Sequence, residues 1–262
     1  MPAAAAAKQR AGAASAGAVP STTARGVRRW AAVLFDLDGT LLDIDGEGFL
    51  DAYVDALTEW WRPGDAAAFR QTVMAAAVPI FASHPGHTNG EVFREHLAAY
   101  LGMTPNEIRR RIHRFHWEDL PSLRFAARAI PDARVCVTHC LKLGLRIAVA
   151  TSPMYMPEVI ELRLRWAGLA DLPWDLVTHS EIMRTCKPHA AYFSETAAHL
   201  GLDPHACMMV GDDPLQDGPA REVGMAVLLR ETTAEPGWRS FRDVSAAVTR
   251  GAALARRADQ RA

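Results

Sequence analysis

An apolar run that ends directly in acidic residues constrains the fold of this chain more than any other feature. Residues 32–46 read AVLFDLDGTLLDIDG, so four apolar residues are followed at once by Asp36 and Asp38. A short continuous apolar run bounded by turn residues is typical of a fully buried strand. Side chains two apart on a strand point to the same side, so both carboxylates should face one point beyond the strand.

Similar apolar runs recur along the chain and predict a parallel sheet. They occupy residues 146–150, 175–178, 207–210 and 225–229, with helical patterns between most of them, for example at 156–167 and 189–200. Alternating strands and helices form parallel sheets, because each right-handed crossover places its helix on a face of the sheet. The sequence therefore predicts an α/β fold, a Rossmann-like parallel sheet sandwiched by helices.

The segment between the first two predicted strands has a different pattern. It holds no convincing strand and four helical patterns, at residues 47–61, 66–81, 89–101 and 105–118. Thr104-Pro105-Asn106-Glu107 is a strong helix start, because it combines a capping residue, proline at the first helical position and glutamate two residues later. We predict an all-helical insert over residues 44–130 within a core formed by residues 30–43 and 131–245.

Three further expectations concern the ends and the surface of the chain. Residues 1–29 contain no acid and no periodic apolar face, so a disordered tail is expected, and a role in targeting stays open. Residues 246–262 are rich in arginine and alanine and are expected to form a peripheral helix or tail. His113 and His116 share a helix face among arginines, which favours a solvated face over a metal pair.

Composition argues against several classes of function. The formal net charge is −1, so there is no basic excess of the kind that nucleic-acid binding requires. No apolar run approaches the length of a membrane span. The four cysteines are too few and too scattered for a disulfide framework, so we expect buried free thiols and a cytoplasmic location.

Polar residues gather where the predicted strands end. The first strand is followed by Asp36 and Asp38, the second by Thr151 and Ser152, and the fourth by Asp212, Asp213 and Asp217. Only three of the 29 cationic residues are lysines, and one of them, Lys187, precedes a predicted helix whose N-terminus favours an anion. Ligands bind at the carboxyl ends of parallel strands, and carboxylates beside a lysine suit Mg²⁺ together with a phosphate.

These residues also carry a family resemblance. Asp36-Leu37-Asp38-Gly39-Thr40, Thr151, Lys187 and Gly211-Asp212 with Asp217 resemble, in order, the four motifs of the haloacid dehalogenase-like hydrolase superfamily. The helical insert resembles the cap of its phosphoglycolate-phosphatase-like subgroup. The stretches TNGEVFREHLAAYLG and LRLRWAGL are similar to an uncharacterised hydrolase branch of that subgroup.

The resemblance implies the roles of the residues that meet the substrate. Asp36 would be the nucleophile that forms an aspartyl-phosphate, and Asp38 the general acid and base. Thr151 and Lys187 would hold the phosphoryl oxygens, with Ser152 as a further candidate. The dehalogenases of the superfamily lack an acid at the position of Asp38, which argues against dehalogenation.

The resemblance also implies a magnesium site. Asp36, the backbone carbonyl of Asp38 and Asp212 would bind Mg²⁺, and Asp217 would support them. Asp213 lies where many members have serine, so its role stays open between added charge near the metal and a position facing solvent.

Together these observations predict a magnesium-dependent phosphatase that acts on a small phosphorylated metabolite, with no nucleic-acid or membrane partner. Two alternatives stay open, a phosphomutase of the same superfamily and a non-catalytic protein that binds a phosphorylated ligand. The identity of the substrate and the oligomeric state do not follow from the sequence.

Overall fold

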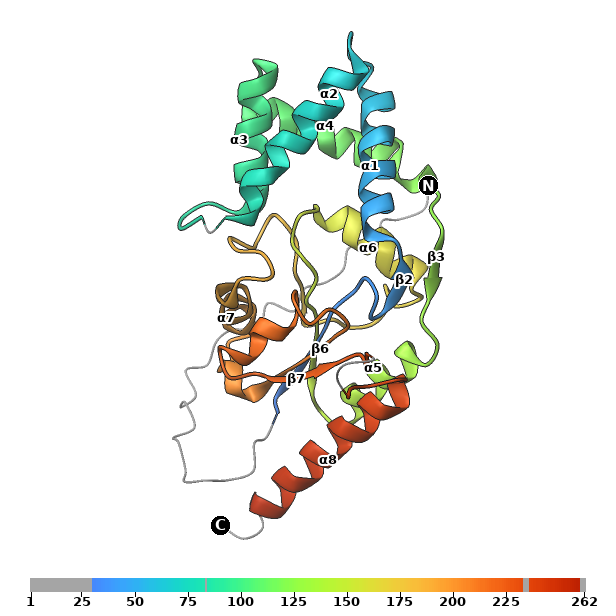
Figure 1. The fold of residues 1–262 in the computed structure, drawn as a ribbon, viewed down its shortest axis with the longest axis vertical. Helices are drawn as coiled ribbons and strands as arrows, with labels where there is room; N and C mark the ends of the chain where they lie inside the picture. The colour runs from blue at the N-terminus through green and yellow to red at the C-terminus, as the bar shows by residue number, and fades with distance from the viewer. Residues whose placement is uncertain (1–29, 83, 233–235, 260–262) are drawn as a thin grey trace.

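The computed structural model describes residues 30–82, 84–232 and 236–259, and it describes the side chains of the last helix to residue 251. The tail expected over residues 1–29 lies outside the described residues. Within them, an α/β part lies below a group of four helices (Figure 1).

Five parallel strands form the sheet of the α/β part, in the order β5-β4-β1-β6-β7. They are β1 (Ala32–Phe35), β4 (Arg146–Val149), β5 (Leu176–Val177), β6 (Cys207–Gly211) and β7 (Ala226–Leu229). The predicted parallel sheet is therefore confirmed. The strand that carries the acids, β1, is central and hydrogen-bonded to a strand on each side. Its side chains are apolar on both faces because each face packs into a hydrophobic cluster.

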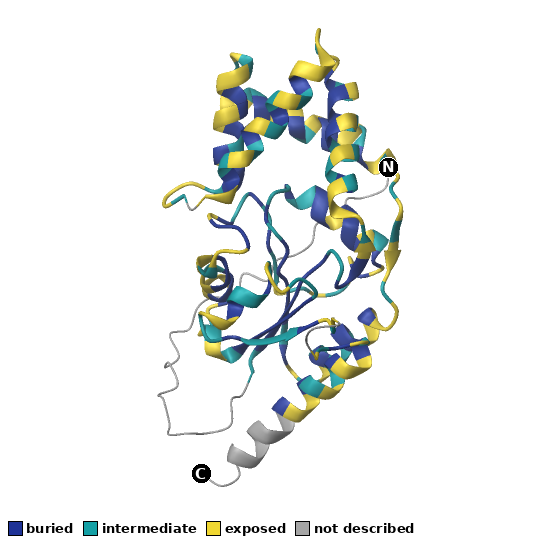
Figure 2. Ribbon diagram, in the orientation of Figure 1, coloured by how far each residue is buried: buried dark blue, intermediate teal, exposed yellow. Residues whose placement is uncertain are grey.

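Helices cover both faces of the sheet. They are α5 (Ala133–Lys142), α6 (Pro157–Trp166) and α8 (Phe241–Asp259) on one face and α7 (Ala190–His199) on the other. Val33 and Phe35 pack on the first face and Leu34 on the second, as the alternation of side chains along a strand requires. Figure 2 shows the strands buried between these layers.

The four helices predicted for the insert are all present. They are α1 (Gly46–Trp61), α2 (Ala66–Ala77), α3 (Asn89–Leu101) and α4 (Pro105–Glu118). A 3₁₀ turn at Val78–Phe81 completes the second predicted helix, because Pro79 lacks the N–H that would continue an α-helix. The predicted capping box at Thr104 is confirmed, and α3 begins with a second one at Thr88.

A two-stranded ribbon joins these helices, called the cap below, to the α/β part. The strands β2 (Leu42–Ile44) and β3 (Ala127–Ala129) pair antiparallel, so both chain connections run side by side. The expectation that residues 44–130 hold no strand was wrong, and the expected boundary at residue 44 falls inside β2. Strands of three residues are too short to show a periodicity in the sequence.

The first turn of α3 docks the cap onto loops of the α/β part. The backbone amides of Asn89 and Gly90 donate to the carbonyl oxygens of Met183 and Ser180, both at 2.8 Å. The buried Asn89 side chain also donates to the carbonyl oxygen of Thr185, at 3.2 Å. The amides at a helix start lack partners within the helix, so this docking satisfies them.

A second polar contact joins the cap to α6 and corrects an expectation from the sequence. His116 is buried rather than solvated, with Nε2 at 2.8 Å from the Tyr53 hydroxyl and Nδ1 at 3.4 Å from Glu158. Glu158 also lies 3.2 Å from His113. Burial opposes the charge on Glu158, but the bond to His116 and the charges of both histidines lower the pKa of Glu158 to about 2.

The C-terminal helix is part of the core rather than peripheral. It begins at Phe241, and Val244 and Val248 are fully buried against the sheet. The ring of Trp30 packs on Gly251, where a Cβ atom would lie 2.3 Å from it. The expectation of a peripheral helix from residue 246 was therefore wrong at least to residue 251. None of the helices in the described part of the chain is long and apolar enough to cross a membrane.

We expect Val248→Ala to lower the free energy of unfolding by about 2 kcal/mol, because it removes two methyl groups from a packed core. Val135→Ala, the same change at an exposed position of α5, should alter it by less than about 0.5 kcal/mol. Chemical denaturation of both variants checks this. Equal and small effects would contradict the docking of α8.

Candidate active site

The candidate site lies at the carboxyl ends of β1, β4 and β6. The chain turns sharply after Asp38, where Gly39 has a φ of 79°. A Cβ atom at Gly39 would lie 2.1 Å from a carboxylate oxygen of Asp212. Glycine is thus required both by the left-handed backbone and by the close approach of the acid that follows β6.

Lys187 lies buried between two of these acids. Its Nζ donates to Asp36 Oδ1 at 2.6 Å and to Asp217 Oδ1 at 2.5 Å, and the residue is only 2% exposed. Burial by itself would lower the pKa of Lys187, but the carboxylates of Asp217 and Asp36 raise it well above the ordinary value. The lysine is therefore held as an ammonium ion.

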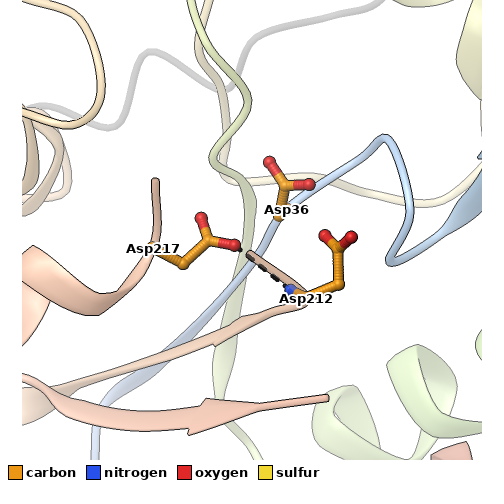
Figure 3. A group of neighbouring side chains, drawn as sticks. All are labelled: Asp36, Asp212 and Asp217. Carbon is orange, nitrogen blue, oxygen red and sulfur yellow. Dashed lines mark hydrogen bonds between the residues drawn. The ribbon is translucent and has the colours of Figure 1, made fainter. Parts of the chain in front are cut away.

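Three carboxylates form a cluster that fits a divalent cation. Oxygen atoms of Asp36, Asp212 and Asp217 all lie within 4.8 Å of one another (Figure 3). Burial raises the pKa of Asp36 although Lys187 opposes it, and burial and the charge of Asp217 raise the pKa of Asp212. Acids in this state are stabilised by a hard cation with oxygen ligands, the class to which Mg²⁺ belongs.

Asp217 differs from the other two acids because both of its oxygens are already bonded. Oδ2 accepts from the backbone amide of Asp212 at 3.2 Å (Figure 3). It also accepts from the amide of Asp213 at 3.3 Å, and Oδ1 accepts from Lys187. A Cβ atom on Gly211 would lie 2.0 Å from Oδ2, so glycine is needed there. Asp217 therefore fixes the backbone that carries Asp212.

The structure gives Asp213 a role that neither sequence alternative included. Its Oδ1 accepts from the backbone amides of Leu215 at 2.7 Å and Gln216 at 3.3 Å. Aspartate commonly caps a turn in this way. The turn returns the chain to Asp217, whose amide donates to the carbonyl oxygen of Asp213 at 2.8 Å.

Thr151 is buried at the end of β4, and its backbone is firmly held. Its carbonyl oxygen accepts from the Thr178 hydroxyl at 2.8 Å and from the Tyr192 hydroxyl at 2.9 Å. Ser152 lies half-buried in the turn that follows. Contact of either residue with a phosphate stays a prediction.

Arg163, which the sequence did not single out, contacts Asp38. It lies on α6, and its Nη1 donates to Asp38 Oδ2 at 3.0 Å. Arginine is the ordinary cation of this chain, so its identity carried no signal, although it lies within the stretch LRLRWAGL and between the buried Leu162 and Leu164. The carboxylate of Asp38 lies outside the acidic cluster, and the predicted metal contact of its backbone carbonyl stays a prediction.

We expect Asp212→Asn to raise the melting temperature of the protein in a chelator near neutral pH. The folded protein binds the Asp212 proton more tightly than the unfolded chain, because burial raises this pKa. Stability from this group is then present below the ordinary aspartate pKa and lost as the pH rises through the raised value. Asparagine does not ionise and still accepts from the Thr40 hydroxyl, which lies 3.1 Å from Asp212 Oδ1.

Thermal melts in EDTA at about pH 4 and about pH 8 check this, since the first lies close to the ordinary aspartate pKa and the second well above it. The advantage of the variant should be small at the lower pH and larger at the higher one, and millimolar Mg²⁺ should remove it. An advantage that does not change with pH would contradict the burial of an ionised Asp212.

Comparison with known proteins finds similar phosphatases and hydrolases. Over 203 residues the chain is 27% identical to phosphoglycolate phosphatase of Rhodospirillum rubrum. This match covers 76% of this chain and 78% of the relative. It is 32% identical to hexitol phosphatase B of Escherichia coli K12 over 84 residues, or 32% of this chain and 36% of the relative. A solved HAD family hydrolase of Deinococcus radiodurans R1 is 20% identical, covers 87% of this chain and 98% of its own, and has a TM-score of 0.48.

The family assignment rests on the sequence match. The model of the haloacid dehalogenase-like hydrolases matches residues 30–222, which include all four predicted motifs and most of the chain. The protein belongs to the haloacid dehalogenase-like hydrolase family.

Proposed function

We propose that the protein is a magnesium-dependent phosphatase that hydrolyses a small phosphorylated metabolite through an aspartyl-phosphate on Asp36. The observation that carries the proposal is the buried ammonium of Lys187 on Asp36 Oδ1. It occupies one oxygen of that carboxylate and leaves the other, Oδ2, for attack on phosphorus. Phosphoryl transfer asks of a protein mainly such positioning and the neutralisation of charge.

The reaction divides into two displacements at phosphorus. In the first, Asp36 Oδ2 forms a bond to phosphorus while the ester bond breaks, and Asp38 gives a proton to the leaving oxygen. In the second, Asp38 takes a proton from water, the water oxygen bonds to phosphorus, and the bond to Asp36 breaks. Lys187 and Thr151 would hold the phosphoryl oxygens during both.

Mg²⁺ would be held by Asp36, Asp212 and the backbone carbonyl of Asp38, where it supplies positive charge for the phosphoryl group. The acidic cluster supports this assignment. Among the described residues, too few positively charged side chains contact its carboxylates to balance their negative charge. Asp217 would act indirectly, by fixing the backbone of Asp212.

The relatives support a phosphate ester as the substrate. Phosphoglycolate phosphatase and hexitol phosphatase B are both named as phosphatases, and they match this chain over 203 and 84 residues. The acid at Asp38 supports the same choice, since a leaving alcohol needs a proton. A cytoplasmic location is part of the proposal and is supported by four buried cysteines that are all free thiols.

We expect the purified protein to release p-nitrophenol from p-nitrophenyl phosphate in the presence of Mg²⁺. Activity should vanish in excess EDTA and return with added Mg²⁺, because the cation neutralises the acids that surround the phosphoryl group. Asp36→Asn should abolish turnover without lowering the melting temperature. Unchanged activity in EDTA would refute the metal assignment, and near-normal turnover by Asp36→Asn would refute the covalent role.

The same assay tests the shape of the cation at position 187. Lys187→Arg keeps the charge, but a planar guanidinium does not fit the space of an ammonium that contacts two carboxylates at once. The displaced nucleophile should lower kcat about a hundredfold. Lys142→Arg, the same change at an exposed lysine of α5, should leave kcat within about twofold of the wild type. Equal kcat values for both variants would place Lys187 outside the reaction.

A further inference from the structure

The guanidinium of Arg163 is fixed between two site residues. Nη1 donates to Asp38 Oδ2 at 3.0 Å, and Nη2 lies 3.4 Å from Thr151 Oγ1. The residue is 2% exposed. Its planar head lies over the rings of Phe49 and Tyr155, with centroid distances of 5.4 Å and 5.0 Å. A guanidinium held at its edge and by aromatic rings has little freedom to turn.

The contact with Arg163 makes the two carboxylate oxygens of Asp38 different. Oδ2 accepts from Arg163, whereas Oδ1 is buried and has no hydrogen-bond partner among the described residues. A buried carboxylate oxygen without a partner is costly and rare in folded proteins. Oδ1 therefore has the capacity to bond a further group, whereas Oδ2 is already held by Arg163.

We propose that Arg163 is a positioning residue, which holds Asp38 in place for the proton-transfer steps. This inference rests on the function proposed above. By holding Asp38 Oδ2, Arg163 leaves Asp38 Oδ1 as the oxygen that exchanges the proton. In the first step the proton on Oδ1 passes to the leaving oxygen as its bond to phosphorus breaks. In the second step Oδ1 takes a proton from water as the water oxygen bonds to phosphorus and Asp36 is released.

The cap contributes to this arrangement without contacting the reacting atoms. Phe49 lies on α1, the first helix of the cap, and is fully buried where that helix meets α6. Its ring therefore fixes the guanidinium from the side of the cap, while Tyr155 does so from the α/β part. Arg163 thus links the packing of the cap, through Phe49, to the position of Asp38.

A burst experiment with p-nitrophenyl phosphate separates this role from others. Its phenolate leaves without a proton, so formation of the aspartyl-phosphate should survive the loss of a well-placed acid. Attack of water still needs Asp38 as a base. We therefore expect Arg163→Met to release about one phenolate per active site in a fast phase, because the covalent intermediate accumulates. Its steady-state rate should be about a hundredfold below that of the wild type.

Arg165→Met is the matched control, because Arg165 lies on the same helix with its side chain exposed, at 3.9 Å from Glu161. It should leave the ratio of burst rate to steady-state rate unchanged. Arg163→Lys keeps a charge but cannot contact Asp38 and Thr151 together, so it should raise that ratio less than methionine does. If Arg163→Met does not fold, this lysine variant carries the comparison.

Four results would overturn the inference. Equal slowing of burst and steady state, or a higher KM at unchanged kcat, would show that Arg163 serves phosphate binding. A lower melting temperature with an unchanged rate ratio would show an ion pair of structural value only. Failure of the wild type itself to release phosphate from any ester in Mg²⁺ would refute the proposed function, and the inference would fall with it.

Discussion

The contact on which this site depends is the buried ammonium of Lys187 between Asp36 and Asp217. Asp36 follows β1 and Asp217 follows β6, so one cation joins the ends of two neighbouring strands. An ion pair without water is strong only when its remaining atoms are also satisfied. Here Asp217 uses its second oxygen on two backbone amides, and in the function that we propose the second oxygen of Asp36 is left for the substrate. The arrangement that stabilises the buried charge therefore also orients the proposed nucleophile.

The cap is seated on the segment that leads to this lysine. Asn89 and Gly90 at the start of α3 bond to the loop before Lys187, and Arg94 of the same helix forms an ion pair with Glu181 in that loop. On the other side, Phe49 of α1 packs on Arg163, which holds Asp38. Lys187 and the proposed acid/base, Asp38, are thus each linked to the cap. A change in how the cap packs on the α/β part is therefore expected to affect both residues.

Local signals in the sequence predicted much of this structure. The apolar residues 32–35 predicted a buried strand, and the capping box at Thr104 predicted the start of α4, because both patterns are set by neighbouring residues. Contacts between distant residues left no such signal. The pairing of β2 with β3, the burial of His116 against Glu158 and the bond from Arg163 to Asp38 each join segments far apart in the chain. In the last case the buried cation, Arg163, is the same residue type as the arginines of the surface, so its residue type did not indicate that it is buried.

Direct identification of the phosphorylated residue tests the central claim. An aspartyl-phosphate formed during turnover is reduced by borohydride to homoserine, which peptide mass spectrometry locates by position. The account predicts homoserine at position 36 in protein quenched during turnover in Mg²⁺, and unmodified aspartate there when the substrate is omitted. Homoserine at another aspartate, or complete turnover with position 36 never modified, would contradict it.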